Sequence, residues 1–273
     1  MSGFSIDWLD LREVADQRAR DDNLLKQARQ WLASVLSQET EKTVVDLGAG
    51  TGSTLRAFAH DSKADQQALY WRLLDQDSEL LAQARVRHAD SHRLQTYELN
   101  LTHISALPLA GAHLITASAL FDLVSADFVD RLEVALHSQQ HTAGLYAALN
   151  YDGTTIWTPV HPLDEAVLEA FNRDQQRDKG FGVALGSEAG NYLERVFSRS
   201  DFKVFTANSP WVLDERDSEL VDALISGIGE AVAEDSTLDA TSLQDWIQFR
   251  KAHLFTGTCV VGHTDLLALP NRD

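Results

Sequence analysis

The sequence has little of what several classes of protein require. Cys259 is the single cysteine among 273 residues, so no disulfide can form within the chain. The apolar run around Cys259 indicates a buried thiol rather than a reactive one. No apolar run approaches the roughly 20 residues of a transmembrane helix, and the N-terminal residues include acids where a secretory signal has basic residues and an apolar core. We therefore expect a cytoplasmic protein with no membrane partner.

Basic residues are also scarce. The chain has 23 Lys and Arg against 41 Asp and Glu, which gives a formal net charge of −18 at pH 7. Because nucleic-acid binders present concentrated positive charge to phosphates, this balance disfavours DNA or RNA as a substrate. The hydrophobic fraction of 44% and the charged fraction of 23% are ordinary for a globular protein.

Short apolar segments alternate with amphipathic helical segments over the first half of the chain. The expected strands are residues 43–48, 68–75, 94–99, 112–118 and 144–150. They are apolar throughout, as strands are when helices cover both faces of a parallel sheet. No repeat or Gly/Ser-rich linker divides the chain. We therefore predict an α/β fold with a doubly wound, mostly parallel sheet of seven strands in a single domain.

The pattern changes after residue 150. Asp152 and Gly153 form a dipeptide that predicts a hairpin turn directly beyond the fifth strand. Helices are expected near 163–176, 187–199 and, as a pair, within 217–254. The last two strands are expected at 202–207 and 258–269.

The stretch "VVDLGAGTGS" at 44–53 carries the most specific signal. Gly48, Gly50 and Gly52 follow a strand and precede a helix, where glycine allows a sharp turn and close approach of a ligand. The spacing is not the Gly-x-Gly-x-x-Gly of a dinucleotide site, and the lysine of a phosphate-binding loop is lacking. Asp46 would repel a pyrophosphate but suits a ligand with an ammonium or sulfonium group.

A second acid marks the end of the second strand. Asp75 lies where a carboxylate can accept hydrogen bonds from both hydroxyls of a ribose. The alternative is that Asp75 caps the next helix, but Asp77 directly precedes that helix and is the better cap.

This combination resembles motif I and the ribose-binding acid of class I S-adenosylmethionine-dependent methyltransferases. "ELNLTH" and "LITASALFDLV" fall where that family contacts adenine and lines the methyl-transfer site. The resemblance implies S-adenosyl-L-methionine as cofactor. It also implies a set of residues that contact this cofactor: Asp46, Gly48, Ala49, Gly50, Gly52, Asp75, Gln76, Asn100, Leu101, Ser118 and Leu120.

The resemblance assigns roles within this set. Asp46 would orient the amino group, Asp75 would hold the ribose, and Asn100 would contact adenine in place of the usual Asp. Residues 1–38 would form an N-terminal helical cap, 39–150 the cofactor-binding core, and 151–273 the substrate-side helices and a terminal strand hairpin.

Arginines cluster near the N-terminus of an otherwise acidic chain. A guanidinium can hold a carboxylate with two parallel hydrogen bonds, so Arg12 and Arg20 are candidates for the cofactor's methionine carboxylate. The alternative is that these arginines form ion pairs with neighbouring acids on the helix surface.

The acceptor pocket is expected beyond the fourth and fifth strands. We assign Asp122, Tyr151 and His161 as catalytic candidates, with His161 as the base by its pKa range, and expect Trp157 to face the same cavity. The glycine-flanked Phe181 marks either a mobile lid or an ordinary connection.

No metal is expected, although two histidine pairs have helical i,i+4 spacing. His88 with His92 and His137 with His141 lie where helices run into loops and lack the glutamate of a zinc-protease motif.

The sequence therefore predicts methyl transfer to a small-molecule acceptor by direct in-line displacement. Two alternatives stay open: a non-catalytic module that binds the same cofactor, and a nicotinamide-dependent oxidoreductase, which the glycine spacing disfavours.

Overall fold

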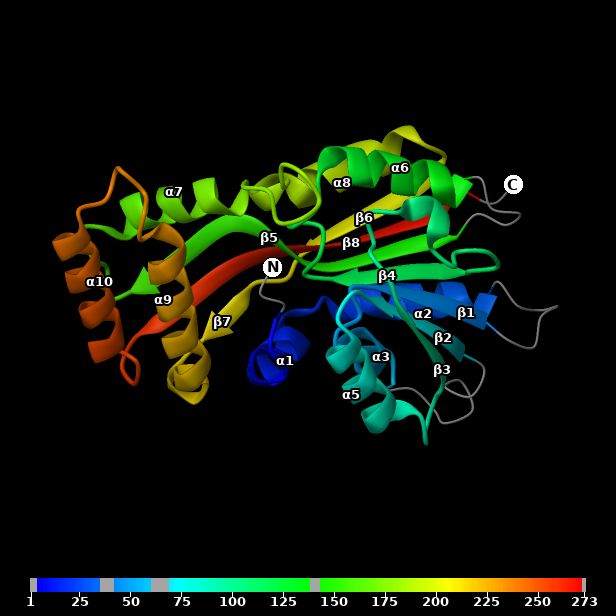
Figure 1. The fold of residues 1–273 in the computed structure, drawn as a ribbon, viewed down its shortest axis with the longest axis horizontal. Helices are drawn as coiled ribbons and strands as arrows, with labels where there is room; N and C mark the ends of the chain where they lie inside the picture. The colour runs from blue at the N-terminus through cyan, green and yellow to red at the C-terminus, as the bar shows by residue number, and fades with distance from the viewer. Residues whose placement is uncertain (1–3, 35–41, 60–68, 138–142, 272–273) are drawn as a thin grey trace.

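A mixed sheet of eight strands forms the centre of the protein (Figure 1). The computed structural model describes residues 4–34, 42–59, 69–137 and 143–271. The strands are β1 (Lys42–Leu47), β2 (Leu69–Asp75), β3 (Arg93–Glu98), β4 (Leu114–Ser118), β5 (Gly144–Thr158), β6 (Phe202–Asn208), β7 (Trp211–Leu213) and β8 (Thr258–Pro270). They are ordered β3-β2-β1-β4-β5-β8-β6, and β7 also pairs with β8.

The first five strands are parallel, whereas β8 is antiparallel to β5, β6 and β7. Helices flank this sheet: α1 (Ile6–Ala19), α2 (Asp22–Ser34), α3 (Ser53–Phe58), α5 (Ser78–His88), α6 (Ala126–His137), α7 (Asp164–Gln175), α8 (Ala189–Arg199), α9 (Ser218–Val232) and α10 (Ala240–Ala252). The predicted doubly wound α/β fold is confirmed. The prediction of seven strands missed β7, which has only three residues. None of the described helices is both long and apolar enough to cross a bilayer.

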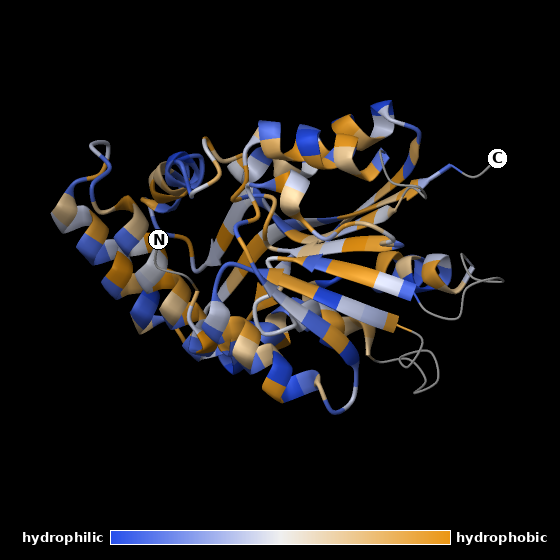
Figure 2. Ribbon diagram, turned by 45° about the vertical axis from the view of Figure 1, so that its right-hand side comes forward, coloured by the Kyte–Doolittle hydropathy of each residue, from blue (hydrophilic) through white to orange (hydrophobic). Residues whose placement is uncertain are grey.

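Alternate residues of the central strands enter two separate cores. Val44 and Val45 are neighbours in β1 and both are fully buried, yet they belong to different apolar clusters. The cluster around Val44 includes side chains of α2, α3 and α5, whereas the cluster around Val45 includes those of α6 and α8. Apolar residues run along the strands and polar residues cover the outer helix faces (Figure 2). This double coverage explains why the strands read as continuous apolar runs.

Strand β5 continues straight through Asp152 and Gly153, so the predicted hairpin turn is wrong. The strand spans 15 residues and pairs with β8 up to Thr158. Gly153 has a φ of 89°, and the register with β8 shifts between Tyr151 and Thr155. The chain therefore forms an irregularity within the strand instead of reversing its direction. Long-range pairing with β8 thus overrides the local turn signal.

The extension of β5, β8 and β7 carries a helical wing made of α7, α9 and α10 (Figure 1). Asp164 joins its parts: the carboxylate accepts hydrogen bonds from Trp246 Nε1 at 2.8 Å and from the backbone N–H of His161 at 2.8 Å. It also pairs with Arg250, whose side chain is 2% exposed. The Arg250 guanidinium in turn lies 5.1 Å from the centroid of the Trp157 ring, 5.2 Å from that of Phe249 and 5.7 Å from that of Trp246.

A second buried carboxylate, Asp265 of β8, fastens the N-terminal helices to the sheet. Asp265 accepts hydrogen bonds from the backbone N–H of Asp21 at 2.9 Å and of Leu149 at 2.8 Å. Leu149 is a non-glycine residue with a φ of 57°, in the left-handed region. Because Asp21 directly follows Arg20, this contact also fixes where α1 ends.

We predict that Asp164→Ala lowers the free energy of unfolding by about 3–5 kcal/mol, because it leaves the buried Arg250 without a counter-charge. Urea unfolding measures this change. The control is Asp127→Ala, which breaks an ion pair with Arg131 in which both side chains are at least half exposed. This control should cost less than about 1 kcal/mol. Equal losses in the two variants would contradict the proposed importance of the buried pair.

Candidate active site

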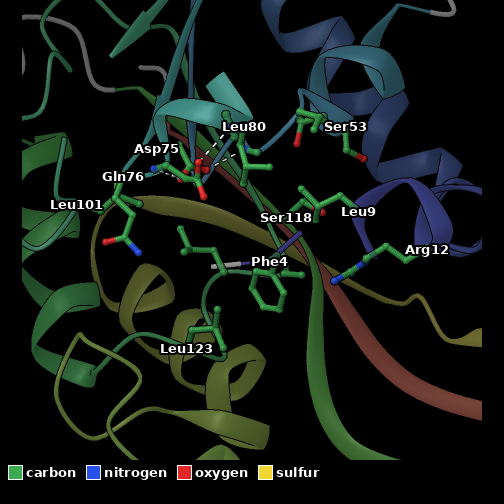
Figure 3. A pocket seen from close by; sticks show the side chains of 18 of the residues that line it. Phe4, Leu9, Arg12, Ser53, Asp75, Gln76, Leu80, Leu101, Ser118 and Leu123 are labelled. Carbon is green, nitrogen blue, oxygen red and sulfur yellow. Dashed lines mark hydrogen bonds between the residues drawn. The ribbon is translucent and has the colours of Figure 1, made fainter. Parts of the chain in front are cut away.

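A cavity of about 800 Å³ opens at the carboxyl ends of β1, β2 and β4. The order β3-β2-β1-β4-β5 reverses direction between β1 and β4, and this switch point is where open parallel sheets bind their ligands. Asp75, Gln76 and Leu101 lie together at one side of the cavity, and Arg12 lies at the other (Figure 3). Ser118 lies between them (Figure 3).

The glycine loop has the backbone geometry that its sequence predicts. Gly48, Gly50 and Gly52 have φ values of 63°, 53° and 88°, which side chains other than glycine rarely adopt. A Cβ atom at Gly50 would lie 3.1 Å from Leu9 of α1. Gly48, Ala49 and Gly50 line the cavity. Gly52 does not; a Cβ atom there would lie 3.0 Å from the His88 ring, so this glycine allows α3 and α5 to approach closely.

Asp75 is joined directly to the glycine loop. Its carboxylate accepts hydrogen bonds from the backbone N–H of Gly50 at 2.8 Å and of Asp77 at 3.0 Å. Burial raises the pKa of Asp75. The helix cap is Asp77, which accepts from the backbone N–H groups of Glu79 and Leu80. The two adjacent acids therefore have different structural roles, and Asp75 lines the cavity.

Asp46 lies behind the loop rather than in the cavity wall. It is 1% exposed and accepts a hydrogen bond from Thr116 Oγ1 at 2.7 Å. Burial raises its pKa to about 7, although the Thr116 hydrogen bond and the nearby Arg20 charge oppose this shift. The neutral and ionised forms of Asp46 thus have similar populations near neutral pH.

The two N-terminal arginines have different surroundings. Arg12 lines the cavity and forms a bidentate pair with Asp16, with Nε–Oδ2 and Nη2–Oδ1 distances of 2.9 and 3.1 Å. This is one of the ion pairs that the sequence left as an alternative. Arg20 is buried, does not line the cavity, and donates from Nη2 to Ser118 Oγ at 2.9 Å. Tyr146, Asp16 and Asp265 are close enough to raise its pKa. Arg20 Nε and Nη1 have no hydrogen-bond partner among the described residues.

Gln76, Leu101, Ser118 and Leu120 all line the cavity. Asn100 does not: it is exposed, and its carbonyl accepts hydrogen bonds from the N–H and hydroxyl of Thr102 at 2.9 and 2.8 Å. The side chain of Asn100 therefore stabilises a local turn, which a reading by motif position does not reveal.

The structure does not bring Tyr151, Trp157 and His161 into the cavity wall, which differs from the prediction. The Tyr151 hydroxyl donates to Asn172 Oδ1 at 2.9 Å, and the Trp157 ring packs against Trp246 with centroids 5.8 Å apart. His161 Nδ1 accepts from a backbone N–H at the start of α7. These positions follow from the continuous β5, which carries Trp157 and His161 out to the helical wing.

Asp122 follows β4 and is buried between two residues of the cavity wall, Leu120 and Leu123. Burial raises the pKa of Asp122 to about 6, and the nearby Arg12 charge opposes this shift. Its Oδ1 atom has no hydrogen-bond partner among the described residues. None of the three catalytic candidates is among the residues that line the cavity, and Asp122 is the one whose chain neighbours include wall residues.

Several wall residues were not identified from the sequence. Phe4 and Leu9 reach the cavity from the N-terminal segment, and they belong to amphipathic sequence with no motif. Lys179 and Phe181 belong to the glycine-flanked segment for which a lid and an ordinary connection were both considered. That segment is ordered by Asp178, which accepts hydrogen bonds from two glycine N–H groups.

Within residues 4–34, 42–59, 69–137 and 143–271, no group of three His, Cys, Asp or Glu side chains could hold a metal ion. The ring centroids of His88 and His92 lie 6.0 Å apart in an edge-to-face arrangement. His88 Nε2 also lies 2.9 Å from Arg56 Nη1. His141 lies outside the described residues.

We predict that Asp46→Asn is more stable than the wild type at pH 8, and that this advantage shrinks on acidification. The unfolded carboxyl has a pKa near 3.9, whereas the folded value is about 7, so ionisation opposes folding as pH rises between them. Each pH unit in this window changes the difference by about 1.4 kcal/mol.

Urea unfolding of both proteins at pH 5, 6, 7 and 8 tests the prediction. The other carboxyls titrate in both chains, so their contributions cancel in the difference. If the difference in the free energy of unfolding between the two proteins does not change with pH, the pKa of Asp46 is not raised in the folded protein.

No protein-family model and no curated protein sequence matches this chain. Solved structures do resemble it. A cyclopropane synthase from Mycobacterium tuberculosis is 12% identical with a TM-score of 0.52, and the match covers 97% of this chain and 95% of that one. A cyclopropane-fatty-acyl-phospholipid synthase-like protein from Lactobacillus casei is 11% identical with a TM-score of 0.51, over 94% and 99% of the two chains. Identities this low concern the fold alone, and they show that the chain has the fold of class I S-adenosylmethionine-dependent methyltransferases.

Proposed function

We propose that this protein binds S-adenosyl-L-methionine and transfers its methyl group to a small-molecule acceptor. The observation that carries the proposal is the hydrogen bond from the Gly50 N–H to Asp75 at the sheet's switch point. It joins a glycine loop with positive φ values to a half-buried acid, and both line one cavity. This arrangement fits a nucleoside whose ribose hydroxyls meet Asp75 and whose body lies over the loop.

The residues beyond the ribose position also fit this cofactor. Leu101 and Gln76 would contact the adenine, and their position beside Asp75 supports this role (Figure 3). At the other end, Arg20 is buried beneath Ser118 with two nitrogens that have no hydrogen-bond partner among the described residues. A buried guanidinium needs acceptors, and the cofactor's carboxylate would supply them. Arg20 is therefore a better candidate for this role than Arg12, whose guanidinium already pairs with Asp16.

The charge of Asp46 also affects the proposed site. Its carboxylate lies behind the loop, close enough to the Arg20 charge that this charge lowers its pKa. A bound ammonium group would favour the ionised form in the same way.

When bound, the cofactor supplies an electrophilic methyl group on a sulfonium centre. The protein's own residues would hold the two reactants in line and exclude water, and such alignment can supply much of the rate enhancement. Leu9 lies over Gly50 of the loop and Phe4 lines the same cavity, and both support this role.

The alternatives differ in what they require of the site. A module that only binds the cofactor would show binding without turnover. A nicotinamide cofactor would bring a pyrophosphate to a loop that lacks the Gly-x-Gly-x-x-Gly spacing of dinucleotide sites.

We predict that S-adenosylhomocysteine, the demethylated form of the cofactor, raises the free energy of unfolding by about 2.7 kcal/mol at 100 times its dissociation constant. NAD at the same concentration should leave the free energy of unfolding unchanged, because the loop lacks the glycine spacing of a dinucleotide site. Thermal unfolding with each compound provides the measurement. Stabilisation by NAD alone would overturn the proposal.

We predict that Asp75→Asn weakens binding of S-adenosylhomocysteine by about 10–100-fold, the loss expected when charge-assisted hydrogen bonds are removed. Asp239→Asn is the matched control, because Asp239 caps α10 outside the cavity wall and asparagine caps a helix about as well as aspartate. It should change the affinity less than about threefold, on the same scale. Isothermal titration calorimetry compares the two variants, and equal losses would show that Asp75 has no special role.

A further inference from the structure

The guanidinium of Arg56 joins separate parts of the chain at the cavity wall. Arg56 belongs to α3 and lines the cavity. Its Nε and Nη2 atoms donate to the carboxylate of Glu13 on α1, and both side chains of this pair are half-buried. Nη1 donates to Thr51 O at 2.6 Å and Nη2 to Thr51 Oγ1 at 3.2 Å. Arg56 thus connects α1 to the glycine loop.

A further acceptor completes the surroundings of this guanidinium. His88 Nε2, on α5, lies 2.9 Å from Arg56 Nη1 and 3.1 Å from Thr51 O. Because a guanidinium can only donate, Nε2 accepts from Arg56 and the ring proton is assigned to Nδ1. Burial and the charge of Arg56 lower the pKa of His88 to about 4, so the ring is neutral near pH 7. All five N–H groups of Arg56 therefore have an acceptor within the protein, which leaves none for a ligand.

Arg56 holds the part of the loop that also binds Asp75. Thr51 directly follows Gly50, whose N–H donates to Asp75 at 2.8 Å. Gly50, Thr51 and Asp75 all line the cavity. Because glycine allows many backbone conformations, contacts on the Gly50 N–H and on the Thr51 carbonyl are needed to select one of them. Without the contact from Arg56, the loop could leave the position in which a ribose reaches Asp75.

A second ion pair of α1 offers a comparison. Arg87 of α5 donates from Nη1 and Nη2 to the two carboxylate oxygens of Asp10, at 2.6 and 2.8 Å. The hydrogen bond with Arg87 lowers the pKa of Asp10, and the nearby Arg56 charge adds to this shift. The two bidentate pairs are therefore neighbours, and both fasten α1 to the half of the sheet that carries the glycine loop. Among the described residues, however, Arg87 donates no hydrogen bond to the loop.

The two pairs differ in one respect, which is the contact of Arg56 with the loop. We propose that Arg56 is a positioning residue for S-adenosyl-L-methionine: its planar fork holds the glycine loop in the conformation that binds the cofactor, and Glu13 keeps the fork in this orientation. Arg56 acts through Thr51 and Gly50 rather than by donating to the cofactor. A lysine would keep the charge but could not serve acceptors on three sides. This inference rests on the proposed function, since it concerns the same cofactor.

The test compares variants of the full-length protein by calorimetric titration with S-adenosylhomocysteine. Arg56→Lys should weaken binding about tenfold and Glu13→Gln about fivefold, on the scale of one hydrogen bond. Asp10→Asn, which breaks the neighbouring pair, should change the affinity less than about twofold. Glu13→Gln should add less than about twofold when residue 56 is already lysine, because Glu13 acts through the guanidinium.

A second measurement follows the loop without any ligand. Hydrogen exchange of the Gly50 amide, measured by NMR, reports how often its hydrogen bond to Asp75 opens. We expect this exchange to be about tenfold faster in Arg56→Lys and to change less than about twofold in Asp10→Asn. If Arg56 only stabilised the fold, Arg56→Lys would accelerate exchange at Val45 in the central strand β1 by the same factor as at Gly50.

The outcomes separate the two proposals. If S-adenosylhomocysteine fails to bind the wild type, the proposed function is overturned, and the exchange at Gly50 still shows whether Arg56 holds the loop. If it binds, the positioning role is overturned by equal losses of affinity in Glu13→Gln and Asp10→Asn, or by an Arg56→Lys variant that binds as tightly as the wild type. If Arg56→Lys does not fold, the comparison of Glu13→Gln with Asp10→Asn still decides the question.

Discussion

The site depends on the buried carboxylate of Asp265, which fixes three parts of the chain at one point. Asp265 belongs to β8. It accepts hydrogen bonds from the backbone N–H of Asp21, just before α2, and of Leu149 in β5. Arg20 immediately precedes Asp21, and its guanidinium reaches Ser118 at the end of β4. The positive charge beneath the cavity is therefore placed by a hydrogen bond outside the cavity.

Helix α1 is fixed from several directions. Glu13 pairs with Arg56 of α3, and Asp10 pairs with Arg87 of α5. On the opposite side, Arg18 pairs with Asp217, just before α9. The helix therefore links the half of the sheet that carries the glycine loop to the wing, and it carries Leu9 and Arg12 to the cavity. Individual surface pairs contribute little, but together they fix the orientation of this helix.

Two residues other than glycine have backbone conformations in the left-handed region, one at the cavity and one in β5. Ala119 follows β4 with a φ of 50° and lines the cavity, and Leu149 in β5 has a φ of 57°. The hydrogen bond from Ala119 N–H to Ala148 O, at 2.9 Å, ties the first of these to the neighbouring strand. Such conformations cost about 1–3 kcal/mol each and persist where the surroundings enforce them. The conformation of Ala119 turns the chain after β4, so that Leu120 and Leu123 face the cavity while Asp122 is buried.

By itself the sequence determined the alternation of strands and helices, the glycine loop and the identity of the helix cap. Each depends on contacts within a few residues: the positive φ values of Gly48 and Gly50, and the Asp77 carboxylate over its own helix. Only the tertiary structure decided the course of β5, because pairing with β8, more than 100 residues away, outweighed the Asp152 turn signal. The same contact carried His161 away from the cavity. The burial of Arg20 and of Asp122 likewise depends on residues distant in the chain, which no local pattern encodes.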